Sequence, residues 1–244
     1  MRNIMIFAPH MDDEAVGCGG LIIKAAREQS KITIVYMIKD EVRKEEAKNI
    51  MTRLGIQAKL IFMDYKKLND KNALLDAIKK VTDLIKKETP TEIYIPSYEG
   101  GHLQHDLTNF IVKKAVNTTK NTQTYEYPLY NNYPIYLPIK MMRRYTSKHL
   151  PFRTGIFPPL FIPEKTKTYV LEMNNGDMKI KRAMIRGYKS QNAQDYLVKN
   201  FLYEDRFRKC PRYDYTKRPH EILPLNYEMV NRGKFKDFRE AINI

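Results

Sequence analysis

Short apolar runs alternate with segments of helical periodicity through the first half of this chain of 244 residues. The apolar runs are 3–9, 31–38, 58–63, 91–96 and 122–127. The segments between them have the three- and four-residue apolar spacing or the charge pattern of helices, at 15–26, 42–54, 74–87 and 108–118. Strands that alternate with helices predict βαβ units. We therefore expect an α/β fold, a three-layer sandwich around a mostly parallel sheet.

The second half of the chain has a different texture, because seven prolines interrupt residues 128–163 and tyrosines and basic residues stand between them. We expect irregular edge strands and long loops there that cover the site, rather than a separate domain. Beyond them we predict a strand at 168–173 and helices at 177–189, 191–207 and 235–242. The expected organisation is a single domain over 1–244, with a core at about 1–127 and covering elements at 128–244.

Polar side chains follow two of the predicted strands at the point where each strand ends. They are His10, Asp12, Asp13 and Glu14 after the first strand, and His102 and His105 after the fourth. Ligand sites of open α/β sheets lie just beyond the carboxyl ends of strands, so these groups are expected to meet. Carboxylates packed this closely need a cation or protons to offset their repulsion, and imidazole with carboxylate suits a divalent metal such as zinc. The sequence predicts a mononuclear metal site with a spare carboxylate that acts as a base.

Simple sequence features disfavour several other classes of protein. Cys18 and Cys210 give neither a disulfide framework nor a C-x-x-C metal knuckle. The start of the chain lacks the apolar stretch of a signal peptide, and no apolar run reaches the ~18 residues of a membrane span, so we expect a cytoplasmic protein. The glycines at 17, 19 and 20 do not match the dinucleotide-binding pattern G-x-G-x-x-G, because Ile22 stands where its last glycine is needed.

The net charge of +15 is compatible with nucleic acid, with an anionic membrane surface or with an anionic substrate. Basicity selects no partner by itself, and a solvated lysine-rich surface is the favoured explanation. The segment 206–213 alternates cations with aromatic residues, as proteins that bind single strands do, but it matches no recognised module. Nucleic acid is therefore the less favoured partner, and the sequence leaves the oligomeric state open. His149 and His220 are interpreted as ordinary structural histidines.

Four motifs carry a resemblance to a known family. Pro9-His10-Met11-Asp12-Asp13-Glu14, followed by Gly17-Cys18-Gly19-Gly20, resembles the P-H-P-D-D-E…G-x-G-G signature of the LmbE-like (PIG-L) N-acetylglucosaminyl deacetylases. Gly101-His102-Leu103-Gln104-His105 resembles their G-H-x-D-H motif, and Arg43-Lys44-Glu45-Glu46-Ala47 their R-x-x-E-A helix. The segment 181–191 is similar to their late helix that ends in Ser-Gln. The resemblance covers 3–130 well and 168–195 loosely.

The resemblance implies a Rossmann-like fold and a metal-dependent hydrolase. Its substrate would be an N-acetylated amino sugar, linked to a glycoside, a lipid or a nucleotide, and an anionic group on that sugar fits the charge of the chain. The implied zinc ligands are His10, Asp13 and His105, and Asp12 would be the general base that deprotonates the zinc-bound water. His102 would stabilise the oxyanion or help to protonate the leaving amine, Arg43 would contact the sugar, and Glu14 and Gln104 would orient their neighbours. Ferrous iron suits the same donors, so Zn²⁺ and Fe²⁺ both stay open.

Three positions depart from the family pattern. Met11 replaces a proline, and Tyr188 stands where many relatives have histidine. Gln104 replaces the aspartate between the two histidines, and an amide gives His102 no ion-pair stabilisation, so we expect a lower pKa for His102 than in the relatives. The alternative to an active deacetylase is therefore a sugar-binding protein on the same scaffold with weakened catalysis.

Overall fold

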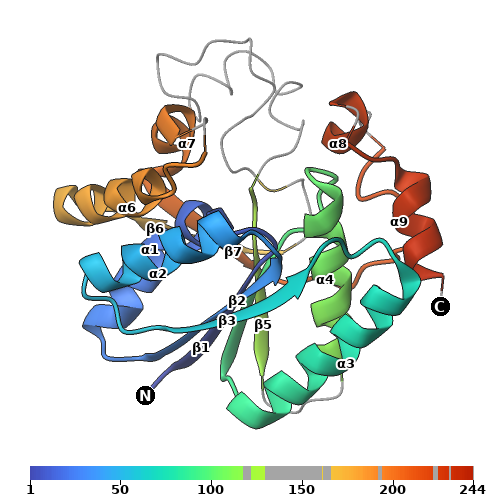
Figure 1. The fold of residues 1–244 in the computed structure, drawn as a ribbon, viewed down its shortest axis with the longest axis horizontal. Helices are drawn as coiled ribbons and strands as arrows, with labels where there is room; N and C mark the ends of the chain where they lie inside the picture. The colour runs from blue at the N-terminus through green and yellow to red at the C-terminus, as the bar shows by residue number, and fades with distance from the viewer. Residues whose placement is uncertain are drawn as a thin grey trace.

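A seven-stranded sheet with the strand order β3-β2-β1-β4-β5-β7-β6 forms the centre of the part of the chain that the computed structural model describes (Figure 1). The described residues are 1–117, 122–129, 161, 166–191, 194–221, 225–230 and 232–243. The strands are β1 (Asn3–Ala8), β2 (Lys31–Ile38), β3 (Lys59–Tyr65), β4 (Glu92–Pro96), β5 (Gln123–Tyr127), β6 (Thr168–Glu172) and β7 (Glu204–Lys209). The expected loops of 128–163 lie outside the described residues, except for 128, 129 and 161.

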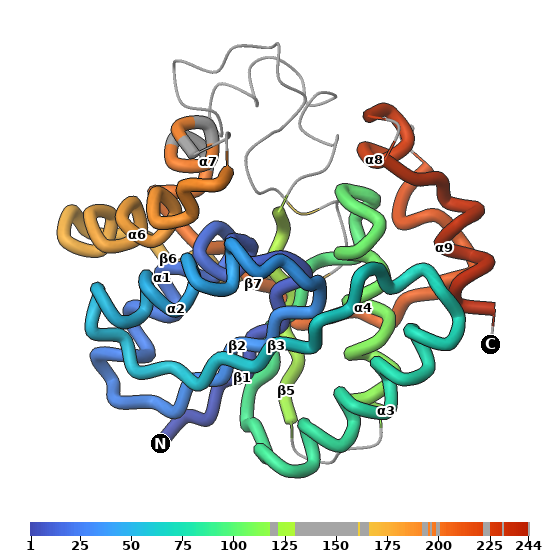
Figure 2. The backbone as a smooth tube through the Cα atoms, viewed as in Figure 1, coloured from blue at the N-terminus to red at the C-terminus, as the bar shows by residue number. Residues whose placement is uncertain are grey.

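The sheet is parallel from β3 to β5, and β7 runs antiparallel to both β5 and β6. One face is covered by α1 (Asp13–Arg27), α2 (Glu41–Arg53), α6 (Asn175–Gly187) and α7 (Gln194–Phe201). The other face is covered by α3 (Lys71–Glu88), α4 (Leu103–Val116), the short α8 (Asn226–Met229) and α9 (Phe235–Ile242) (Figure 2). The expected three-layer α/β sandwich is confirmed.

Strand β1 lies at the centre of this sandwich because its side chains alternate between the two cores. Ile4 and Ile6 belong to the core under α1, and Met5 and Phe7 belong to the core under α3 and α4. The chain leaves β1 toward β2 and β3 on one side, whereas β4 and β5 lie on the other side. The strand order therefore reverses between β1 and β4, and a switch point of this kind opens a crevice at the carboxyl ends of the two strands. The segments that follow β1 and β4 meet there.

Helix α1 comes close to the sheet because glycine occupies the contact. A Cβ atom at Gly17 would lie 2.3 Å from the ring of Tyr127. The Tyr127 hydroxyl in turn donates to the carbonyl oxygen of Phe7 at 2.7 Å. The glycine-rich turn thus holds the start of α1, and the acidic residues within it, against the end of β1.

Two predicted helices differ from the observed elements. The predicted helix 191–207 is wrong in its second part, since α7 ends at Phe201 and 204–209 form β7. Pairing with β5 and β6 overrides the local helical spacing, because it gives Arg208 a buried partner in Glu126. The helix predicted at 108–118 begins earlier, at Leu103, because the His102 side chain caps its first turn.

The first part of the basic segment 206–213, residues 206–209, belongs to strand β7. Arg208 is only 2% exposed and is bound to Glu126, and Arg206 forms an ion pair with Glu204. These two guanidinium groups are therefore already partnered within the fold, which weakens a nucleic-acid role for the segment. Among the described residues, no helix has both the length and the apolar character needed to cross a bilayer.

Candidate metal centre

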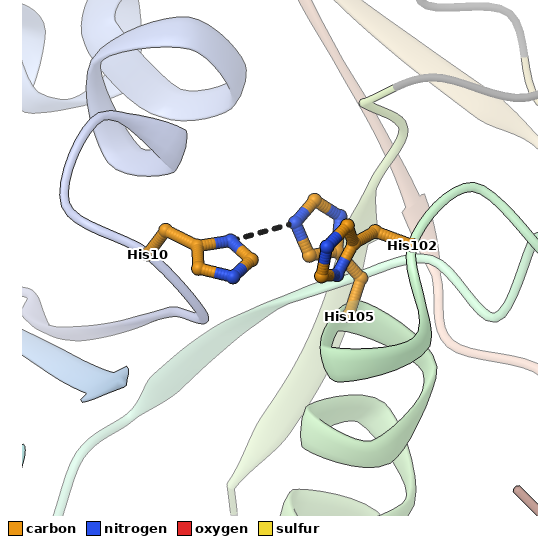
Figure 3. A group of neighbouring side chains, drawn as sticks. All are labelled: His10, His102 and His105. Carbon is orange, nitrogen blue, oxygen red and sulfur yellow. Dashed lines mark hydrogen bonds between the residues drawn. The ribbon is translucent and has the colours of Figure 1, made fainter. Parts of the chain in front are cut away.

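Three donor atoms from two distant segments converge between the ends of β1 and β4. His10 Nδ1 and His105 Nε2 face each other at 3.2 Å (Figure 3). Asp13 Oδ2 lies 3.3 Å from His10 Nδ1 and 3.2 Å from His105 Nε2. The three atoms thus form a nearly equilateral triangle, made by residues that are up to 95 positions apart in sequence.

The triangle fits the ligand spacing of a tetrahedral cation. Bonds of about 2.0–2.1 Å to nitrogen and oxygen place two ligand atoms of a tetrahedron roughly 3.3 Å apart. A third imidazole is close, since one nitrogen each from His10, His102 and His105 can be chosen within 4.8 Å of one another. His102 lies edge-on to His10, with ring centroids 4.7 Å apart. The donor atoms therefore suit zinc or ferrous iron. Two sets of three ligands are available: His10 and His105 together with Asp13, or His10 and His105 together with His102.

Asp12 stands beside this triangle on a strained stretch of backbone. Its φ of 141° lies in a region that non-glycine residues rarely adopt, at a cost of about 1–3 kcal/mol. The backbone N–H of Asp12 donates to Glu14 Oε2 at 3.1 Å, which helps to hold this conformation. Burial and the charge of Asp13 raise the pKa of the Asp12 carboxyl well above its usual range, and the Arg43 guanidinium opposes the rise. Such a carboxylate is a stronger proton acceptor than an exposed aspartate.

Glu14 connects Asp12 to a helix from the other end of the chain. Its Oε1 accepts a short hydrogen bond from the hydroxyl of Tyr188, which follows α6. Glu14 and Tyr188 are fully buried, as is Tyr36 of β2 next to them. Burial raises the pKa of the Glu14 carboxyl to about 7, and the bonds from Tyr188 and the Asp12 N–H oppose the rise. The network links the late part of the chain to the backbone of Asp12.

We expect the substitution Tyr188→Phe to weaken both the fold and the site. It leaves a buried carboxylate oxygen of Glu14 without its hydroxyl donor, at a cost of about 1–3 kcal/mol in the free energy of unfolding. If the network positions Asp12, kcat should also fall more than KM changes. Denaturant titration and steady-state kinetics measure the two effects. Tyr125→Phe is the matched control, because the Tyr125 hydroxyl donates to Gln123 at an exposed site; equal effects of both variants would contradict the role of the network.

His102 begins α4 and faces the site. Its Nδ1 accepts the backbone N–H of Gln104 at 3.2 Å, so the neutral imidazole carries its proton on Nε2. Burial lowers the pKa of His102 to about 2, with further contributions from His105 and His10. The pKa of His102 is therefore low, and burial is its main cause. The Gln104 side chain accepts a hydrogen bond from the Leu68 N–H at 2.8 Å, which ties the segment before α3 to the start of α4.

A pocket of about 200 Å³ opens over these groups. It is lined by His10, Asp12, Asp13, Val16, Arg43, His102, Gln191, Leu197 and Arg232. Arg43, on α2, places a guanidinium nitrogen 3.9 Å from Asp12 Oδ1 and another 3.3 Å from Asp40 Oδ2. The structure thus brings Arg43 together with the residues of the metal centre, whereas the side chains of Glu14 and Gln104 are directed into hydrogen bonds outside the lining of the pocket.

The sequence analysis assigned no role to several contributors to the site, among them Leu197, Arg232 and Tyr188. Leu197 lies on α7, Arg232 lies between α8 and α9, and Tyr188 acts at a distance through Glu14. The late Ser-Gln motif pointed to Gln191 and to the neighbourhood of Tyr188. No signal in the weakly patterned tail pointed to Arg232.

Comparisons with known proteins agree with this fold and these motifs. Residues 5–116 match the family model described as PIG-L: GlcNAc-PI de-N-acetylase, so the resemblance of the three motifs within this range is confirmed. The fold is similar to that of the teicoplanin deacetylase Orf2 in a zinc-inhibited form, at 14% identity and a TM-score of 0.60 over 87% of this chain and 99% of that chain. It is also similar to the N,N'-diacetylchitobiose deacetylase from Pyrococcus horikoshii, at 20% identity and a TM-score of 0.57 over 86% of this chain and 84% of that chain.

A third solved structure with a similar fold carries a different activity. It is GalB, the 4-carboxy-2-hydroxymuconate hydratase from Pseudomonas putida KT2440, at 15% identity and a TM-score of 0.56 over 87% of this chain and 98% of that chain. Since one scaffold carries both deacetylases and a hydratase, the reaction has to be argued from the residues of the site.

Proposed function

Since residues 5–116 match the PIG-L family, we propose that this protein is a metal-dependent hydrolase that removes the N-acetyl group from an amino sugar. The observation that carries the proposal is the triangle of His10, Asp13 and His105 donor atoms, with the Asp12 carboxylate beside it, at a pocket that His10, Asp12 and Asp13 line. Hydrolysis of an amide needs an activated water, a partner for the oxyanion and a proton for the leaving nitrogen. The residues around this pocket are suited to each of these tasks.

His10, Asp13 and His105 would hold the cation, which is Zn²⁺ or Fe²⁺. The cation, when bound, supplies Lewis acidity that polarises the amide carbonyl and makes a water molecule more acidic. His102 stands next to this set, but its Nδ1 is taken up by the Gln104 N–H at the start of α4. This leaves Nε2 as the ring nitrogen without that bond, and we assign His102 to the substrate rather than to the ligand set.

Asp12 would act as the general base. It accepts a proton from water as the water oxygen attacks the carbonyl carbon, and it returns that proton to the nitrogen as the C–N bond breaks. The products are acetate and the free amino sugar. The raised pKa of Asp12 suits this double role, because a stronger base accepts the proton readily and remains able to release it to the amine.

His102 would donate its Nε2 proton as a hydrogen bond to the oxyanion. The low pKa of this imidazole keeps it neutral, so it serves as a hydrogen-bond donor and not as a source of protons near neutral pH. Arg43, whose guanidinium lies at the Asp12 side of the pocket, would contact the sugar.

The class of substrate rests on the names of the family and of its relatives. The family name refers to a GlcNAc-lipid, and the similar structures include deacetylases of teicoplanin and of N,N'-diacetylchitobiose. Two of these names, that of the family and that of the chitobiose deacetylase, contain an N-acetylated sugar. A glycoside, a lipid-linked sugar or a nucleotide-linked sugar is the corresponding substrate proposed for this chain.

Acetate release from purified protein tests the proposal. The protein is stripped of metal with a chelator and divided, and one part is reloaded with Zn²⁺ and another with Fe²⁺ under anaerobic conditions. Each part is then assayed with glycosides, a lipid conjugate and a nucleotide conjugate of N-acetylglucosamine. We expect acetate from at least one substrate with reloaded protein and none with stripped protein. Equal acetate release by stripped protein would rule out the metal, and binding without acetate release would favour the sugar-binding alternative.

A further inference from the structure

A second guanidinium group in the pocket is the feature that the proposed reaction does not use. Arg232 lies in the segment between α8 and α9, on the opposite side of the sheet from α2, which carries Arg43. Both arginines line the pocket that contains His10, Asp12 and His102. In Figure 2, α7, which carries Leu197, and α8, which ends shortly before Arg232, stand on either side of the same end of the sheet.

Arg232 is available to a ligand, whereas Arg43 is partly engaged. The Arg43 guanidinium lies within 3.9 Å of Asp12 and 3.3 Å of Asp40. The Arg232 side chain is exposed, and within the described part of the chain it forms neither an ion pair nor a side-chain hydrogen bond. Its backbone N–H donates to the carbonyl oxygen of Tyr227 at 2.8 Å, which fixes the segment that carries it.

The acidic residue nearest to Arg232 in sequence is already occupied. Glu228 forms an ion pair with Arg218, and its carboxylate also accepts the backbone N–H groups of Phe235 and Leu225, at 3.0 and 3.3 Å. Glu228 is therefore bound on several sides by groups other than Arg232. The positive charge of Arg232 also reaches His102, whose protonated form it disfavours. Arg232 thus lies at the His102 side of the pocket, and Arg43 lies at the Asp12 side.

The balance of charge in the pocket favours an anionic ligand. The carboxylates of Asp12 and Asp13 cancel the two guanidinium groups in formal charge. A divalent cation at the metal centre therefore leaves the loaded pocket with net positive charge. Arginine binds carboxylate and phosphate through paired N–H groups, and such bonds are stronger than neutral ones.

We propose that the amino sugar deacetylated in this pocket carries a phosphate or a carboxylate group, and that Arg232 binds this group and thereby determines the specificity for charged substrates. The inference rests on the proposed deacetylase function for the identity of the sugar. It does not rest on that function for the existence of the anion site, which a binding experiment tests separately.

Three sugars separate the outcomes in a kinetic experiment with the zinc-loaded protein. They are the methyl glycoside of N-acetylglucosamine, which is neutral, N-acetylglucosamine 1-phosphate, and the carboxymethyl glycoside of N-acetylglucosamine. We expect kcat/KM to be at least about tenfold higher for one of the charged sugars, since one charge-assisted contact is worth about that factor. The charged sugar whose kcat/KM depends more strongly on Arg232 shows whether phosphate or carboxylate is the recognised group.

The variants decide whether Arg232 is responsible. Arg232→Gln should reduce the ratio of kcat/KM between charged and neutral sugars by about tenfold, mainly through KM, and Arg232→Lys should retain part of the preference. Lys236→Gln is the matched control, because Lys236 is an exposed cation four residues away that pairs with Glu240; it should leave the ratio unchanged. Equal loss for all three sugars in Arg232→Gln, or no preference in the unmodified protein, would overturn the proposal.

Calorimetric binding to the metal-loaded Asp12→Asn protein gives a readout that does not depend on turnover. N-acetylglucosamine 1-phosphate or the carboxymethyl glycoside should bind more tightly than the methyl glycoside, and adding Arg232→Gln should abolish the difference. If this holds while the unmodified protein releases acetate from none of the sugars, the deacetylase function fails and the anion site stands. If charged and neutral sugars bind equally, the anion site fails whatever the catalytic result.

Discussion

The substitution Asp12→Asn is expected to lower kcat for acetate release by roughly 10²–10⁴-fold, the range typical of a lost general base. Asparagine has the size and shape of aspartate, and it is among the residues that accept a positive φ most readily, so the backbone at φ 141° should be retained. The Asp12 carboxylate is not needed for the triangle of donor atoms formed by Asp13 and the two histidines. Metal content, measured by mass spectrometry of the purified protein, should therefore stay unchanged.

Asp64→Asn is the matched control for this variant. Asp64 also has a positive φ, of 56°, and its exposed side chain lies 3.4 Å from Lys44, away from the pocket. The control should keep both its kcat and its metal. If Asp12→Asn retained turnover close to that of the control, Asp12 would not be the base and the proposed proton transfers would be wrong.

The second large effect is expected at the metal centre itself. Asp13→Ala and His105→Gln should each weaken the binding of Zn²⁺ by more than about 100-fold, because the loss of an outer-shell partner alone already costs about 10–100-fold. Acetate release should then disappear at metal concentrations that saturate the unmodified protein. Competition with a fluorescent zinc chelator measures the affinity directly, and it needs no substrate.

His220→Gln is the control for the loss of a buried imidazole. His220 is 7% exposed and is not among the residues that line the pocket. Its variant should bind zinc with unchanged affinity, although it can be less stable. Because Asp13 also accepts the backbone N–H of His10 at 2.8 Å, the thermal stability of each variant has to be measured beside its zinc affinity. A folded Asp13→Ala protein with full zinc affinity would remove Asp13 from the ligand set.

The parallel half of the fold could be predicted from the sequence because its signals are local. Each strand from β1 to β4 is a short apolar run, and each helix between them repeats its apolar or charged residues at helical spacing. The meeting of His10 with His105 also followed from a local rule, since each residue comes just after a strand and parallel strands end at one edge of the sheet. The triangle of donor atoms agrees with that expectation.

The elements that could not be predicted depend on partners far away in sequence. Strand β7 has an ambiguous local pattern, and its identity comes from the pairing of Arg208 with Glu126, 82 residues earlier. Tyr188 reaches Glu14 across 174 residues. Arg232 belongs to a tail with weak periodicity, and only the folded chain brings it to the pocket. Contacts of this kind produce no regular spacing in the sequence from which they could be predicted.

Anomalous scattering of zinc in a crystal of the zinc-loaded protein locates the metal and its ligands. We expect one strong peak within bonding distance, about 2.0–2.2 Å, of His10 Nδ1, Asp13 Oδ2 and His105 Nε2, with Asp12 outside the ligand set. A peak bonded to His102 in place of Asp13, a peak bonded to Asp12, or no peak between the ends of β1 and β4 would contradict this expectation.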